Sequence, residues 1–172
     1  MNWPVDDAMA GPLSPSAQKI QNLLNDLGQP IHVVEFAATT RTAAEAAAVI
    51  GCDAAQIAKS IVFRMREKNA PVLVVASGAT RINEALVARV LADTLNGDRL
   101  LRADPEFVRL TTGYPIGGVP PLGHAVTPIT LFDKRLLGFP AVWAAAGTPN
   151  AVFAIAPDVL ARLAGARVVD VA

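Results

Sequence analysis

Lys59 is the residue whose surroundings most clearly raise the question of chemistry. It lies in the run QIAKSIVF, where β-branched and aromatic residues predict a strand. If the strand begins near Lys59, its period of two places Lys59, Ile61 and Phe63 on one face and Ser60 and Val62 on the other. A lysine on an apolar face either extends its stem toward solvent or offers a cation inside a pocket. The strand pattern by itself favours the first alternative and leaves the second open.

Two glycine-containing segments could supply main-chain donors. Gly113 to Gly123 reads GYPIGGVPPLG, with four glycines and three prolines in eleven residues, a density that excludes a helix or a central strand. Its amides could converge on an anion, or the segment could be a connecting loop, since no phosphate-binding fingerprint is present. The segment 146–150, AGTPN, is either a plain turn or a place where the Gly147 and Thr148 amides meet a bound carbonyl.

Other kinds of site find little support in the sequence. The chain has one cysteine, Cys52, which excludes an intrachain disulfide and suits a reducing cytoplasm; its simplest role is core packing. His32 and His124 are far apart, no cysteine cluster accompanies them, and no G-x-S-x-G motif occurs. We therefore expect no metal, no cofactor and no covalent nucleophile.

Length and composition indicate one soluble domain over residues 1–172, with 1–13 as an N-terminal arm. The sequence is 52% hydrophobic and 17% charged, and no stretch approaches the roughly 20 apolar residues of a membrane span. The first residues carry Asp6 and Asp7 and no apolar core, unlike a signal peptide. Net charge is zero, which argues against broad binding to a DNA or RNA duplex but allows contact with a short single-stranded end.

The elements that would position these residues alternate irregularly between helix and strand. Apolar spacing, caps and glycine stops predict helices over 14–27, 43–50, 84–95, 105–112 and 157–163. Thr42 and Glu45 have the spacing of a capping box, in which Glu45 reaches back to the Thr42 amide. Strands are expected over 32–36, 60–64, 71–77, 129–132, 141–145, 152–155 and 167–171, with a short turn over 54–58 and a hairpin loop over 65–70. This order predicts a mixed α/β fold with a curved, largely antiparallel sheet flanked by helices.

Taken together, these segments resemble a known family. QIAKSIVF, VLVVASGATRIN, TGYPIGGVPPLG, a strand with Asp133, and AAAGTPN are similar in order and spacing to the YbaK/prolyl-tRNA-synthetase-associated editing domains, from about Thr42 to Leu163. Two places depart from that pattern. Pro120-Pro121 stands where many relatives have Ser-Pro, and the distal turn is Gly-Thr-Pro-Asn. Both departures concern which amino acid is recognised.

The resemblance implies hydrolysis of the ester between a wrong amino acid and a tRNA, by a free-standing cytoplasmic enzyme. It implies Lys59 and Gly147 as catalytic groups, Lys59 near the terminal adenosine and Gly147 with its amide on the ester carbonyl. The substrate-binding residues would be Ser60, Ile61, Phe63, Gly113, Ile116, Gly117, Gly118, Thr148 and Pro149. The expected partner is the acceptor end of a mischarged tRNA, with tRNA(Pro) and a small amino acid favoured, and prolyl-tRNA synthetase or an elongation factor as further candidates. The alternative is a non-catalytic tRNA- or synthetase-binding module of the same fold.

Overall fold

The structure is a computed structural model that describes residues 12–37 and 40–172. Its strands are β1 (Val34–Glu35), β2 (Ile57–Met65), β3 (Ala70–Ser77), β4 (Leu100–Arg102), β5 (Ile129–Asp133), β6 (Val142–Ala145), β7 (Ala151–Ile155) and β8 (Arg167–Val169). Its helices are α1 (Pro15–Asp26), α2 (Ala43–Ile50), α3 (Glu84–Val90), α4 (Ala92–Leu95), α5 (Pro105–Thr112) and α6 (Pro157–Leu163). The predicted N-terminal arm falls almost wholly outside the described residues.

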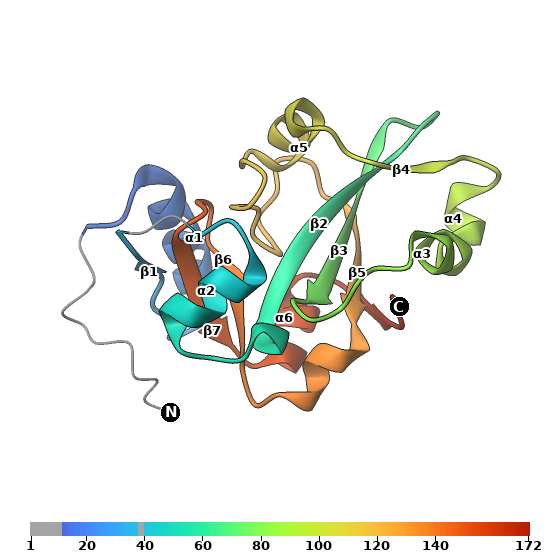
Figure 1. The fold of residues 1–172 in the computed structure, drawn as a ribbon. Coiled ribbons are helices and arrows are strands. Elements are labelled where there is room, and N and C mark those ends of the chain that lie inside the picture. Colours follow the sequence, from blue (N-terminus) through green and yellow to red (C-terminus); the bar gives the residue numbers. More distant parts are fainter. Residues whose placement is uncertain (1–11, 38–39) are drawn as a thin grey trace.

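The strands form one mixed sheet in the order β1-β7-β6-β2-β3-β5-β8, and β4 pairs with β2 outside that path. Antiparallel pairs join β1 to β7, β2 to β3, β2 to β4 and β6 to β7, whereas β2–β6, β3–β5 and β5–β8 are parallel. The long β2–β3 hairpin crosses the molecule, with α3 and α4 on one side of it and α1 and α2 on the other (Figure 1). The predicted mixed α/β fold with a mainly antiparallel sheet flanked by helices is confirmed.

Both faces of the β2–β3 hairpin are buried, because successive side chains alternate between two apolar clusters. Ala58 and Val62 pack in a cluster with α1, α5 and α6. Phe63 and Met65 pack on the opposite face in a second cluster, together with side chains of α3. The alternation predicted for Lys59 to Phe63 is therefore confirmed.

Several predicted boundaries change in the structure. The strand expected over 32–36 is limited to β1, and the helix expected over 84–95 is interrupted at Leu91, which separates α3 from α4. Strand β2 begins at Ile57, because a capping box between Asp53 and Gln56 closes a 3-10 turn one residue earlier. Strand β4 was not predicted; it is three residues long and pairs with the end of β2.

The start of α2 matters because it borders the site described below. The Thr42 hydroxyl accepts a hydrogen bond from the Glu45 amide at 3.1 Å, as the capping spacing predicts. The Glu45 carboxylate, however, accepts from the Arg41 amide at 2.7 Å and not from that of Thr42. The predicted reciprocal bond was therefore wrong by one residue, and Glu45 fixes the backbone at Arg41.

Candidate active site

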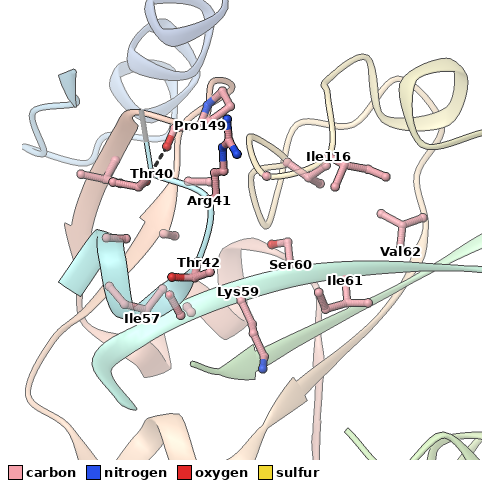
Figure 2. Close-up of a pocket in the computed structure, with 18 of the residues that line it drawn as sticks. Thr40, Arg41, Thr42, Ile57, Lys59, Ser60, Ile61, Val62, Ile116 and Pro149 are labelled. Carbon is pink, nitrogen blue, oxygen red and sulfur yellow. Dashed lines mark hydrogen bonds between the residues drawn. The ribbon is translucent and has the colours of Figure 1, made fainter. Parts of the chain in front are cut away.

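A cavity of about 330 Å³ lies at one edge of β2. Its lining comes from β2 and β6, from residues 40–46 at the start of α2, from the end of β4, and from the glycine-rich loop. Most of the lining is apolar, including Val62, Val108, Val119 and Trp143. Figure 2 shows β2 running beneath this space, with Arg41 and Thr42 on one side and Ile116 on the other. Of the predicted site residues, the cavity brings together Lys59, Ser60, Ile61, Ile116, Gly117 and Pro149.

Lys59 borders the cavity with its stem, while its ammonium group lies on the other face of β2. Lys59 Nζ donates a hydrogen bond to the Thr80 carbonyl at 2.6 Å. In Figure 2 this nitrogen points away from Ser60 and Ile116. Partial burial lowers the pKa of Lys59, the nearby Arg102 lowers it further, and Asp133 opposes both effects. An ammonium group has three donors, so two remain for a ligand oxygen after the bond to Thr80.

Ser60 points the opposite way, into the cavity (Figure 2). Its hydroxyl oxygen is buried and has no hydrogen-bond partner among the described residues. Buried hydroxyl groups are normally paired, so this one is available to hydrogen-bond a ligand in the cavity. The polar group facing the cavity from this strand is therefore Ser60, and the lysine cation lies across the strand from it.

Two arginines that the sequence reasoning missed also border the cavity. Arg102, at the end of β4, pairs with Glu84 at 2.5 Å and lies over the Phe63 ring, 5.7 Å from its centroid. Arg41 is exposed and stands just before α2. For Arg41, the sequence offered one indication of its position: it directly precedes Thr42, the residue that caps α2. Nothing in the sequence placed Arg102, because its strand was not predicted.

Glycines join the glycine-rich loop to the distal turn. The Gly147 amide donates to the Gly118 carbonyl at 2.9 Å. A Cβ on Gly118 would come within 2.8 Å of Thr148 Cα, and one on Gly147 would come within 2.9 Å of the Ser16 carbonyl oxygen. The loop can approach Thr148 this closely only because Gly118 has no side chain, and the turn can approach Ser16 only because Gly147 has none. We call this contact between Gly118 and the 147–148 segment the glycine clasp.

The glycine clasp corrects two predictions. The Gly147 amide is engaged by Gly118 and does not line the cavity, so it is not a free donor for a substrate carbonyl. Gly118 is buried against Thr148 and likewise lies behind the cavity wall. The glycine clasp holds the loop residues Ile116 and Gly117, and Pro149 of the distal turn, at the border of the cavity.

Three further predicted site residues lie elsewhere. Phe63 is fully buried in the cluster across the sheet, because its place in the alternation puts it on the Lys59 face. Gly113 ends α5 with a φ of 88° and does not reach the cavity. Thr148 turns away to hydrogen-bond the Glu35 carboxylate and the Asn150 side chain, each at 3.2 Å.

Hydrogen bonds to β1 and to Thr40 hold the distal turn on the side away from the glycine clasp. Glu35 accepts from the Thr148 hydroxyl and, at 2.8 Å, from the Ser14 amide. Thr40 donates to the Pro149 carbonyl at 2.8 Å, as drawn in Figure 2. These bonds fix Pro149 against the cavity from residues more than one hundred positions away in sequence.

Carboxylate, imidazole and thiol groups are absent from the described cavity wall. No Asp, Glu, His or Cys is among its lining residues. Across residues 12–37 and 40–172, no three such side chains gather closely enough to hold a metal ion, and no helix is long and apolar enough to span a membrane. Cys52 lies outside the cavity, partly buried beside the small cluster under α2, and burial raises the pKa of its thiol.

Comparison with known proteins agrees with this architecture. A family model described as "Aminoacyl-tRNA editing domain" matches residues 37–163. "Uncharacterized protein YwhH" of Bacillus subtilis (strain 168) is 32% identical over 136 residues, which cover 79% of this chain and 83% of that protein.

Solved structures share the fold over nearly the whole chain. A crystal structure described as that of "a putative trans-editing enzyme for prolyl tRNA synthetase" is 45% identical, with a TM-score of 0.83, and covers 92% of this chain and 97% of its own. The crystal structure of "hypothetical protein APE2540" is 29% identical, with a TM-score of 0.78, over 89% and 98% of the two chains. The chain therefore belongs to the aminoacyl-tRNA editing domain family, as its sequence motifs led us to expect.

Proposed function

We propose that this chain hydrolyses the ester joining a small amino acid to the 3′ end of a mischarged tRNA, with tRNA(Pro) as the first candidate. The observation that carries the proposal is an apolar cavity of about 330 Å³ bordered by Arg41 and Arg102, with the Lys59 ammonium group across β2 from it. Apolar walls suit a small side chain, and basic groups at the border suit the phosphates of an RNA end. The likeness to a structure described as that of "a putative trans-editing enzyme for prolyl tRNA synthetase" supports the choice of tRNA.

The small size of the wrong amino acid explains why an editing site separate from the synthetase pocket is useful. A synthetase pocket built for proline discriminates poorly against a smaller amino acid, since one missing methylene changes binding by only about 1–3 kcal/mol. A second site with a small cavity can hydrolyse what the first site accepted. Pro149, held by Thr40, and Ile116, held by the glycine clasp, are fixed at the border and would limit the size of the admitted side chain.

The reaction needs little from the protein beyond positioning and charge. A water oxygen forms a bond to the ester carbonyl carbon, the bond from that carbon to the ribose oxygen breaks, and the leaving oxygen takes up the proton that the water gives up. The products are the free amino acid and uncharged tRNA. Because the described wall offers no Asp, Glu, His or Cys, we assign orientation of the water to the neighbouring ribose hydroxyl of the substrate.

In this scheme Lys59 supplies positive charge to the terminal adenosine and not to the ester, because its ammonium group lies across β2 from the cavity. Its ammonium group is held by Thr80, and its two remaining N–H groups can meet a phosphate or ribose oxygen of the terminal adenosine. Removing one well-placed donor of this kind lowers kcat by roughly 10²–10³-fold.

A deacylation panel tests the proposal. The purified chain is incubated with tRNA(Pro) charged with alanine, serine, threonine, cysteine or proline, and release of each amino acid is followed beside a blank without protein. We expect at least one small non-cognate residue to be released, and prolyl-tRNA to be spared. Arg89→Ala, which removes an exposed cation on α3 outside the cavity, is the matched control for Lys59→Ala. Binding of uncharged tRNA with no turnover on any member of the panel would instead identify a non-catalytic module.

A further inference from the structure

Strand β2 has one complete edge and one interrupted edge. Along the first, β3 pairs with β2 from Ala58 to Met65. Along the second, β6 pairs only with Ile57 and Ala58, and β4 pairs only with Phe63 to Met65. Between these two short ladders lies Ser60, in the part of β2 that borders the cavity.

The main chain of Ser60 faces the interrupted edge. The Ile57 carbonyl accepts from the Gly78 amide on the β3 side, and the Val62 carbonyl accepts from the Ala103 amide on the β4 side. Residues two apart in a strand direct their N–H and C=O groups to the same edge. Ser60, two residues before Val62, therefore presents both groups to the gap.

Neither β4 nor β6, the two described strands on this edge, fills the gap opposite Ser60. Two residues beyond Ala103, the same register would bring Pro105 there. Pro105 begins α5 and has no N–H to donate. On the other side, the β6 ladder ends at the pair Ala58–Ala144. Within the described chain, the N–H and C=O of Ser60 thus have no ladder partner, and its buried hydroxyl is also unpaired.

We propose that the aminoacyl group of the substrate takes the place of the missing strand residue. This inference rests on the proposed function. An aminoacyl ester carries an α-ammonium donor and a carbonyl acceptor with the spacing of one peptide residue. In an antiparallel pair, two opposite residues exchange both N–H···O bonds. The Ser60 carbonyl accepts from the α-ammonium group, and the Ser60 amide donates to the ester carbonyl oxygen.

This placement has two consequences. The Ser60 amide becomes the main-chain donor for the charge that develops on the carbonyl oxygen, the role that the sequence had led us to expect of Gly147. Opposite residues of an antiparallel pair also direct their side chains to the same face. The amino-acid side chain then lies beside the Ser60 hydroxyl, on the face where Val62 and Val119 pack, and away from Lys59.

A backbone substitution tests the donor directly. The α-hydroxy-acid analogue of serine, introduced at position 60 by nonsense suppression, replaces the N–H with an ester oxygen and makes the Lys59 carbonyl a weaker acceptor in the β2–β3 ladder. The control is the same change at Ala85, an exposed position in the first turn of α3, which also removes an N–H that needs no helical partner and weakens the preceding carbonyl. We expect both analogues to lower the melting temperature by a similar small amount, because the Ser60 N–H has no ladder partner among the described residues, and only the position-60 analogue to lower kcat, by about 10²–10³-fold.

A change in the substrate tests the Ser60 carbonyl as the acceptor for the α-ammonium group. Lactyl-tRNA(Pro) differs from alanyl-tRNA(Pro) by a neutral hydroxyl in place of the α-ammonium group. After each rate is divided by that of spontaneous hydrolysis, we expect kcat/KM to favour the alanyl ester by about tenfold or more, since a charged donor makes the stronger bond.

The outcomes separate this inference from the proposed function. If the unmodified protein releases no amino acid from any charged tRNA, the proposed function fails. If it is active, but the position-60 analogue keeps the full rate or loses more thermal stability than the Ala85 analogue, the Ser60 amide is not the carbonyl donor. Equal normalised rates on alanyl and lactyl esters would overturn the assignment of the Ser60 carbonyl.

Discussion

Gly118→Ala should damage the site without touching the cavity itself. The added methyl carbon would lie 2.8, 2.9 and 3.0 Å from Thr148 Cα, C and N, all of which are backbone atoms that no side-chain rotation can move. The loop and the distal turn must therefore separate, which strains or breaks the hydrogen bond between the Gly147 amide and the Gly118 carbonyl.

The size of this effect follows from two contributions. Overpacking a tight site costs about 1–3 kcal/mol, and the net loss of a buried hydrogen bond costs about 0.5–1.5 kcal/mol. We expect the free energy of unfolding to fall by about 2–4 kcal/mol. For a chain of this length that corresponds to a melting temperature lower by about 5–15 °C.

Urea and thermal denaturation followed by circular dichroism measure both quantities. Gly138→Ala is the matched control, because no atom lies within 4 Å of its added carbon and its φ is not in the left-handed region. We also expect Gly118→Ala to lower deacylation more than its loss of folded protein explains, since Ile116 and Pro149 are displaced at the cavity border. A Gly118→Ala protein as stable as Gly138→Ala would refute the glycine clasp as a structural contact.

Three further predictions concern charged residues. Lys59→Ala should lower deacylation by about 10²–10³-fold while Lys59→Arg retains part of the rate, as measured by single-turnover release; full activity of Lys59→Ala would remove the lysine from the mechanism. Because the pKa of Lys59 is lowered in the folded state, the folded protein disfavours the charged form at pH values below that pKa. The penalty disappears as pH rises toward the ordinary pKa of lysine, so wild type should gain stability relative to Lys59→Met between pH 8 and pH 10 in urea titrations, and a loss would contradict the sign. Glu35→Gln weakens two charge-assisted bonds, to the Thr148 hydroxyl and the Ser14 amide, and should lower the free energy of unfolding by about 1–3 kcal/mol, whereas an unchanged urea midpoint would show that these bonds do not support the turn.

The fold could be predicted from the sequence where local chemistry is decisive. Asp104 before Pro105 predicted the start of α5, and Asn83 predicted the start of α3, because each cap satisfies amides within its own first turn. Strand β4 could not be predicted in this way. It is three residues long, two of them exposed, and it is a strand because the end of β2 offers it a partner.

The site was predicted only in part, because local patterns do not show which distant segments meet. The strand period correctly separated Lys59 from Ser60, but it could not tell which face of β2 borders the cavity, since Arg41 and Arg102 arrive from distant segments. The Gly147 amide was misassigned because its acceptor, the Gly118 carbonyl, lies 29 positions away along the chain. A missing ladder partner beside Ser60 depends on where two other strands end, which no local pattern records.

The most direct measurement of the central claim is amino-acid release from mischarged tRNA(Pro) by the purified wild-type chain under single-turnover conditions. The apolar cavity with its basic border predicts release of at least one small non-cognate residue at a rate far above spontaneous hydrolysis, with prolyl-tRNA(Pro) left intact. Spontaneous rates for every aminoacyl ester, at a protein concentration that binds the tRNA, would contradict it.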